Sequence, residues 1–124
     1  MAAQTTVLIV DDDEAVRDSL RLLLEMSGRE VQDFASGAAL LAALPDGAGC
    51  LVLDYHMPEL NGLDLLEAVR ARDMTVPAIL ITGLGDPRIR RRASEAGVIE
   101  VLDKPFNDRA LLAAVGRALG EDAA

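Results

Sequence analysis

The chain of 124 residues has few aromatic side chains, a single cysteine and no surplus of basic residues. Phe, Trp and Tyr make up only 2% of it, so its core must be built from Leu, Val, Ile and Ala. The lone Cys50 excludes an internal disulfide and a cysteine-rich zinc site, and its place in an apolar run favours a buried thiol. The net charge of −9 argues against direct nucleic acid binding, which requires an excess of Lys and Arg.

Long apolar runs are absent as well. No run approaches the about 18 residues that span a bilayer, and residues 1–6 lack the basic and apolar regions of a signal peptide. We therefore expect a cytoplasmic protein without membrane attachment. The length predicts a single domain over residues 1–124, with a core between about residues 5 and 120.

Short apolar runs rich in β-branched residues recur along the chain and predict strands. They lie at residues 7–10, 30–34, 50–53, 78–81 and 98–102. Most are continuously apolar, which is typical of strands buried on both faces of a parallel sheet. The run at 30–34 is more polar and suits a sheet edge.

Each strand is followed by apolar residues at helical spacing. Ser36, Asp86 and Asn107 are candidate N-caps, and Gly28 and Gly97 stand where helices end. Strict alternation of strand and helix predicts an α/β fold, with a mostly parallel sheet covered by helices on both faces.

Polar side chains stand where the predicted strands end. They are Asp11 and Asp12 after the first strand, Asp54 after the third, Thr82 after the fourth and Lys104 after the fifth. Each has an ordinary structural explanation, such as helix capping by the acidic run at 11–13. In a parallel sheet, however, these ends meet at one edge, where open α/β sheets bind ligands. The coincidence at four strand ends favours a shared site.

The chemistry of such a cluster is specific. Close carboxylates repel one another, and Mg²⁺ relieves the repulsion through oxygen ligands and water. One carboxylate can attack phosphorus as a nucleophile and form an aspartyl phosphate. Mg²⁺, the Lys104 ammonium and the Thr82 hydroxyl would stabilise the charge on the transferred phosphoryl group.

Four motifs occur in a fixed order on this alternation. They are Val10-Asp11-Asp12, Leu53-Asp54-Tyr55-His56-Met57-Pro58 followed by Asn61-Gly62, Ile81-Thr82-Gly83, and Lys104-Pro105-Phe106. Together they resemble the receiver domain of response regulators in two-component systems, over roughly residues 5–120. The stretches at residues 81–86 and 16–20 are most similar to the FixJ-like subgroup.

The resemblance implies a fold and a set of roles. The fold is flavodoxin-like and doubly wound, (βα)5, with a five-stranded parallel sheet in the order 2-1-3-4-5. The implied roles are phosphoryl acceptor for Asp54, contacts to the phosphoryl group for Thr82 and Lys104, and Mg²⁺ ligation by Asp11, Asp12, Asp54 and the backbone carbonyl of His56. The Lys104–Pro105 bond would be cis.

The resemblance also implies partners. The phosphoryl donor would be a sensor histidine kinase, a phosphotransfer protein or a small molecule such as acetyl phosphate. The phosphorylated chain would change its association with a partner or with a second copy, through the face formed by the fourth helix, the fifth strand and the fifth helix. The chain would thus be a switch rather than an enzyme.

Three positions bear on how the switch would work: one departs from the family pattern, and two affect the lifetime of the phosphate. Val101 stands three residues before Lys104, where the family usually has an aromatic ring that swings inward with the threonine. In this family, the positions of His56 and Leu84 affect how long the phosphate lasts. A transition-metal role for His56 is disfavoured because it is the only histidine, so we expect a partly exposed loop residue beside the pocket.

Arg88, Arg90, Arg91 and Arg92 place a third of the basic residues on one predicted helix. They form either a solvated face paired with Glu95 and Glu100, or an output surface for an acidic partner or a second copy.

Three other functions are compatible with a small α/β domain. A haloacid-dehalogenase-type phosphohydrolase needs a second acid two residues after the nucleophile, and His56 stands there. A nucleotide-binding P-loop is excluded because residues 83–85 are too short for one. A receiver-like interaction module that works without phosphorylation remains open: the acidic set argues against it and Val101 argues for it.

Overall fold

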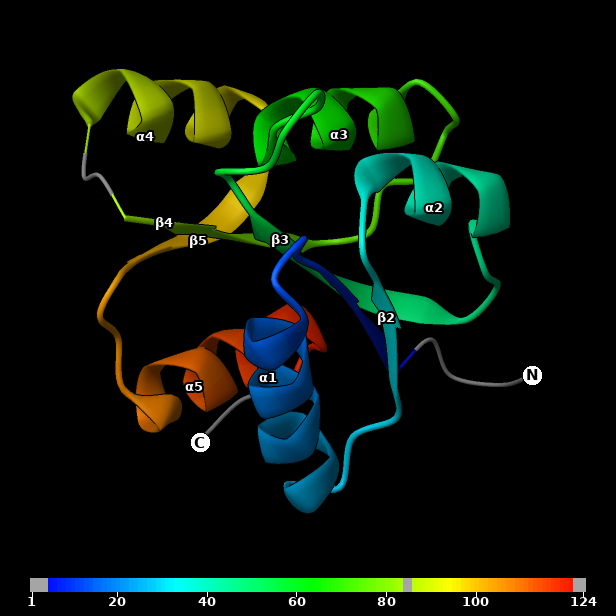
Figure 1. Cartoon of the computed structure of the whole chain (residues 1–124), viewed down its shortest axis with the longest axis vertical. Helices are drawn as coiled ribbons and strands as arrows, with labels where there is room; N and C mark the ends of the chain where they lie inside the picture. Colours follow the sequence, from blue (N-terminus) through cyan, green and yellow to red (C-terminus); the bar gives the residue numbers. More distant parts are fainter. Residues whose placement is uncertain (1–4, 84–85, 122–124) are drawn as a thin grey trace.

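Strands and helices alternate along the computed structural model, which describes residues 5–83 and 86–121 (Figure 1). The strands are β1 (Thr6–Val10), β2 (Val31–Phe34), β3 (Ala48–Asp54), β4 (Ala78–Thr82) and β5 (Val98–Asp103). The helices are α1 (Glu14–Met26), α2 (Gly37–Ala43), α3 (Gly62–Arg70), α4 (Pro87–Glu95) and α5 (Asp108–Ala118). All strand pairs are parallel, in the order β2-β1-β3-β4-β5. The predicted fold and strand order are confirmed.

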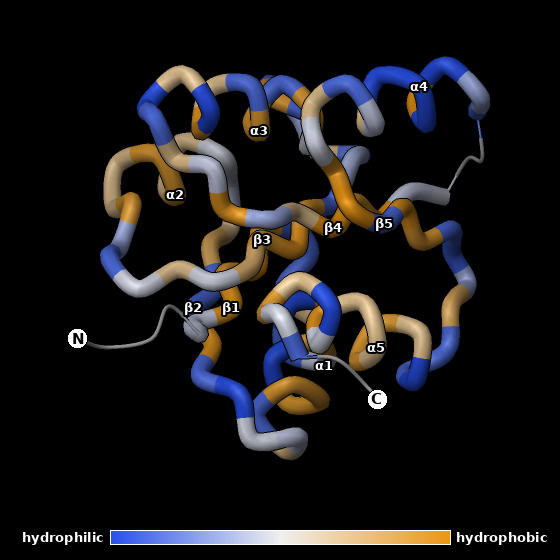
Figure 2. The backbone as a smooth tube through the Cα atoms, turned by 180° about the vertical axis from the view of Figure 1, so that it is seen from behind, coloured by the Kyte–Doolittle hydropathy of each residue, from blue (hydrophilic) through white to orange (hydrophobic). Residues whose placement is uncertain are grey.

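Helices cover both faces of the sheet. Figure 1 shows α2, α3 and α4 on one face and α1 and α5 on the other. Along β1, Leu8 and Val10 join the core under α2–α4, whereas Val7 and Ile9 join the core under α1 and α5. The apolar strands run between the two helical layers (Figure 2). Burial on both faces explains why these strands are continuously apolar rather than alternating.

Helix starts follow the capping residues. Five side chains accept backbone N–H groups of a first helical turn: Asp13, Ser36, Asn61, Asp86 and Asn107. Such caps each contribute about 1 kcal/mol because they satisfy donors that have no partner within the helix. The three predicted caps are therefore confirmed. Asp13 provides the capping that was the ordinary explanation of the acidic run.

The strand boundaries differ slightly from those expected. β3 begins at Ala48 instead of residue 50, and β2 begins at Val31 instead of residue 30. β2 is an edge strand, as its polar sequence suggested, and β5 forms the other edge. No helix in the described ranges is both long enough and apolar enough to cross a membrane.

Candidate functional site

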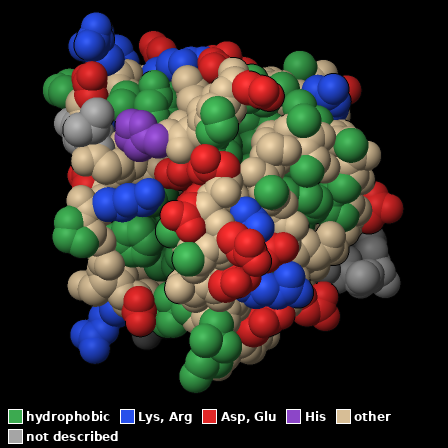
Figure 3. Space-filling model, viewed as in Figure 1, with side chains coloured by type: hydrophobic (Ala, Val, Ile, Leu, Met, Phe, Trp, Pro, Cys, Tyr) green, Lys and Arg blue, Asp and Glu red, His purple; other side chains and the backbone are tan. Residues whose placement is uncertain are grey.

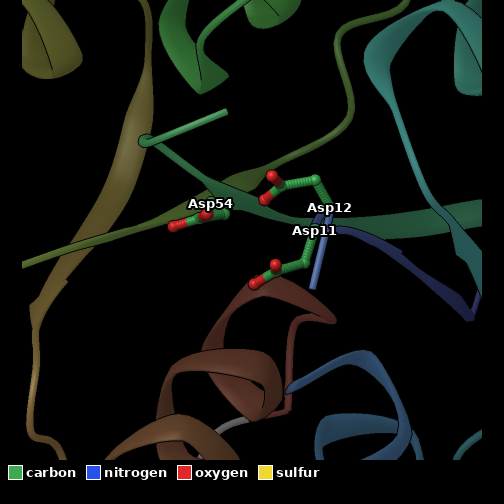
Figure 4. Close-up of side chains that lie close together, drawn as sticks. All are labelled: Asp11, Asp12 and Asp54. Atoms are coloured by element: carbon green, nitrogen blue, oxygen red, sulfur yellow. The ribbon is translucent and has the colours of Figure 1, made fainter. Parts of the chain in front are cut away.

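Three carboxylates meet at the edge of the sheet where the strands end. Asp11 and Asp12 directly follow β1, and Asp54 is the last residue of β3. One oxygen of each lies within 4.8 Å of the others, and the three side chains extend to the same side (Figure 4). Asp11 and Asp54 are only 2% and 4% exposed, whereas Asp12 is open to solvent.

The backbone around Asp54 is held tightly. Leu53 is in register with Val10 of β1, and Asp54 with Ile81 of β4. The first residue of α3, Gly62, lies so close that a Cβ atom there would be 2.6 Å from the carbonyl oxygen of Asp54. Only glycine permits this approach. The Asn61-Gly62 pair was predicted only through the family resemblance, and its packing role was not.

Burial dominates the electrostatics of the two inner carboxyls. It raises the pKa of Asp11, an effect opposed by the backbone N–H of Asp13, which donates to Asp11 Oδ1 at 2.8 Å. Burial likewise raises the pKa of Asp54, opposed chiefly by Lys104, whose Nζ lies 3.5 Å from Asp54 Oδ1. That distance is an ion pair but too long for a good hydrogen bond.

Two carboxylate oxygens lack hydrogen bonds. Among the described residues, Asp11 Oδ2 and Asp54 Oδ1 are buried without a hydrogen-bond partner. Buried polar atoms are rarely left in this state, because burial without a partner costs free energy. Two such oxygens on neighbouring strands, with the exposed Asp12 beside them, form an all-oxygen donor set that fits Mg²⁺ with several of its waters.

The cation and the hydroxyl approach from the neighbouring strands. The backbone N–H of Lys104 donates to the carbonyl of Thr82 at 2.8 Å, which joins the end of β5 to the end of β4. The Lys104–Pro105 bond is cis, as the resemblance implied. Thr82 is 1% exposed. The structure thus brings all five strand-end residues to one edge, while their chemical roles stay predictions.

His56 makes a contact that the sequence did not predict. Its exposed ring lies on the loop after β3, as expected, but Nε2 is 3.1 Å from Thr82 Oγ1. The contact joins residues 26 positions apart in the chain and depends on two side-chain rotamers, so no local pattern could reveal it. Ligation by the His56 carbonyl stays a prediction, and Leu84 lies outside the described residues.

The arginines of α4 pair differently from the expectation. Arg88 pairs with Asp86, Arg90 with Asp103, and Arg92 with Asp64 and Glu67, whereas Glu100 pairs with Arg117 of α5. The expected pairing with Glu95 and Glu100 is therefore wrong. Glu100 pairs with α5, and Arg92 turns towards α3 because two acids stand there.

Val101 and Cys50 lie against or within the hydrophobic core. Val101 is half-buried and packs against the core under α2–α4. It stands where the family usually has an aromatic ring. Cys50 is fully buried, as predicted, and burial raises the pKa of its thiol to about 12.

Comparison with known proteins identifies the class to which this fold and this acidic edge belong. Residues 7–116 match the model of the response regulator receiver domain, so the chain belongs to that family. Members of this family are the receiver domains of response regulators.

Within the family, the chain is FixJ-like, which confirms the subgroup expected from its motifs. It is 43% identical to the transcriptional regulatory protein FixJ of Azorhizobium caulinodans, over 99% of this chain and 59% of that protein. FixJ of Rhizobium meliloti is 41% identical, over 91% and 56%. The crystal structure of FixJ-N has a TM-score of 0.87 and 39% identity, covering 100% of this chain and 99% of that one. The chain thus spans somewhat more than half of these curated relatives.

Proposed function

We propose that Asp54 accepts a phosphoryl group in a Mg²⁺-dependent reaction, with a sensor histidine kinase or a phosphotransfer protein as donor in the cytoplasm. One observation carries the proposal. The oxygen Asp54 Oδ1 is buried without a hydrogen bond, lies 3.5 Å from the Lys104 ammonium and belongs to a cluster of three carboxylates. A nucleophilic oxygen left unbonded beside a cation suits attack on phosphorus.

The surrounding residues support the same reaction. Asp11, Asp12 and Asp54 would hold Mg²⁺, together with the His56 carbonyl, and the bound ion would neutralise charge on the phosphoryl oxygens. Lys104 Nζ, 3.5 Å from Asp54 Oδ1, would supply a second positive charge beside the phosphoryl group. Thr82 stands at the neighbouring strand end, where its hydroxyl would donate to a phosphoryl oxygen.

The chain would act as a switch that modifies only itself. Its output would pass through the face formed by α4, β5 and α5, towards a partner or a second copy in a homodimer. On this face, Arg90 and Arg117 are each paired within the chain, to Asp103 and Glu100. Ile99 of β5 is 44% exposed and offers an apolar contact on the same face.

A module that works without phosphorylation is the second candidate. Val101 favours it, because the family's usual ring is missing from the path between Thr82 and the surface.

Intact-mass measurement separates the two candidates. The chain is incubated with acetyl phosphate and Mg²⁺ beside Asp54→Asn and Asp46→Asn, the latter a charge-matched control in the loop before β3. We expect one phosphate adduct in wild type and Asp46→Asn, and none in Asp54→Asn. The absence of any adduct favours the phosphorylation-independent module, whereas rapid turnover of many phosphate esters favours a hydrolase.

The output face is tested by sedimentation. With beryllium fluoride and Mg²⁺ as a mimic of the phosphoryl group, Ile99→Asp should weaken self-association. Leu22→Asp, at an exposed position of α1, which is not part of this face, should leave it unchanged. Equal effects of both variants would exclude the α4–β5–α5 face.

A further inference from the structure

The Thr82 hydroxyl is already engaged by a side chain that the proposed phosphoryl transfer does not use. His56 Nε2 lies 3.1 Å from Thr82 Oγ1, although Thr82 is almost completely buried and the His56 ring is exposed. Figure 3 shows a histidine side chain on the surface beside the acidic cluster. The contact therefore connects the interior of the site directly to the molecular surface.

The ring of His56 is held from a second side. The Tyr55 ring meets it edge-on, with centroids 4.9 Å apart and planes at 86°. Tyr55 is half-buried and packs against the core under α2–α4. His56 thus has a defined position, fixed by Tyr55 on one side and by Thr82 on the other.

A hydroxyl carries one proton, so Thr82 cannot donate to two acceptors at once. A phosphoryl oxygen on Asp54 is negatively charged, and hydrogen bonds to charged acceptors are about twice as strong as neutral ones. A neutral imidazole nitrogen therefore loses the competition for the Thr82 proton once the phosphoryl group is present.

We propose that His56 is a positioning residue for Thr82, which donates its hydroxyl proton to His56 Nε2 in the unmodified chain and transfers that hydrogen bond to the phosphoryl group on Asp54. This proposal rests on the phosphorylation of Asp54 proposed above. It adds a way in which the modification would be signalled at the surface. The released His56 ring changes the surface next to the site. An exposed ring in direct contact with Thr82 thus supplies the output that Val101 cannot.

The single histidine makes a direct test possible. Imidazole ¹⁵N shifts report which ring nitrogen carries the proton, and they are recorded on tag-free chain in mildly alkaline buffer, where a free imidazole is uncharged. We expect the proton on Nδ1 and an acceptor signature at Nε2 in the unmodified chain. Beryllium fluoride with Mg²⁺ should abolish the Nε2 signature. A proton on Nε2 before modification, or shifts that do not respond to the mimic, would overturn the proposal.

Binding affinities give an independent test. The His56–Thr82 bond stabilises only the unmodified state, so its removal should favour the state that binds the mimic. We expect His56→Ala and His56→Phe to bind beryllium fluoride about fivefold more tightly, the value of one ordinary hydrogen bond. His56→Gln, whose amide oxygen reaches about as far as Nε2 and can accept the proton, should restore the wild-type affinity.

A double-mutant cycle separates positioning from a general loop effect. In a Thr82→Val background, His56→Ala should give no gain, because the hydroxyl is gone. A persistent gain, or a His56→Gln variant that behaves like His56→Ala, contradicts the proposal. If wild type binds the mimic and the His56 variants do not differ from it, this proposal alone fails. If wild type neither binds the mimic nor forms an Asp54 adduct, both proposals fail.

Discussion

Replacing Asp11 by Asn removes one buried negative charge from the site while keeping the shape of the side chain. The Asn Oδ1 can still accept the backbone N–H of Asp13, which Asp11 Oδ1 accepts at 2.8 Å. The variant therefore isolates the charge of Asp11 from its packing. We expect the metal-free variant to be more stable than wild type at neutral pH.

The magnitude follows from the geometry. Two charges 4.8 Å apart, the outer limit for this cluster, repel by about 3.5 kcal/mol at an effective dielectric constant of about 20. The variant also avoids the desolvation cost of the buried Asp11 carboxylate, which adds to its stability. It loses the attraction between Asp11 and Lys104, which lowers its stability. We expect the free energy of unfolding to rise by about 1–3 kcal/mol, or the melting temperature by about 5–10 °C.

Calorimetry in EDTA and in Mg²⁺ provides the assay. In EDTA, Asp11→Asn should melt above wild type. In Mg²⁺, the difference in melting temperature should shrink or reverse. The ion stabilises the wild-type chain by an amount that grows with the logarithm of its affinity, and the variant has lost a ligand. Asp13→Asn is the matched control. It removes the same charge from an exposed neighbour and keeps the cap, since Asn and Asp cap equally well.

Two results would refute the reasoning. If Asp11→Asn melts at or below wild type in EDTA, the buried carboxylates do not destabilise the metal-free fold. If Asp13→Asn is stabilised equally, the gain comes from the overall negative charge and not from the site.

The other predictions concern pH, packing, capping and reactivity. Because the folded-state pKa of Asp11 is raised, the stability gap between Asp11→Asn and wild type in EDTA should close as pH falls through that pKa, measured by urea unfolding. Gly62→Ala should lower the free energy of unfolding by about 1–3 kcal/mol, because its Cβ would meet the Asp54 carbonyl; a loss below about 0.5 kcal/mol would contradict the close contact. Ser36→Ala should cost about 1 kcal/mol in the same assay, since it removes the cap of α2. Cys50 should resist maleimide in the native chain and react only on unfolding, because its thiol is buried and its pKa is about 12; rapid native labelling would disprove this.

Local sequence signals predicted most of the fold. Continuous apolar runs marked the strands because both faces of the sheet are covered. Ser36, Asp86 and Asn107 marked helix starts through hydrogen bonds to residues only two or three positions further along the chain. The convergence of the site residues was also predictable, because parallel strands bring their carboxyl ends to one edge.

Contacts that depend on rotamers and long separations were not predictable. The His56–Thr82 hydrogen bond joins the loop after β3 to the end of β4. Whether Asp54 Oδ1 has a hydrogen bond depends on the position of the Lys104 ammonium, which is set by the Lys104 rotamer. The predicted ion-pair partners of the α4 arginines were wrong for the same reason. Arg92 pairs with two acids on α3, 25 and 28 positions away, and not with the glutamates closer to it in the chain.

The close seat of Gly62 against Asp54 divides the site into a fixed half and an adjustable half. The main chain of Asp54 is clamped by β1, β4 and the first turn of α3, with no room for even one added methyl group. Thr82 is the last residue of its strand, and its side chain contacts the exposed ring of His56. A phosphoryl group on Asp54 would therefore be attached to a main chain that does not move. The structural change that its charge causes should begin at Thr82, at the β4 side of the sheet edge.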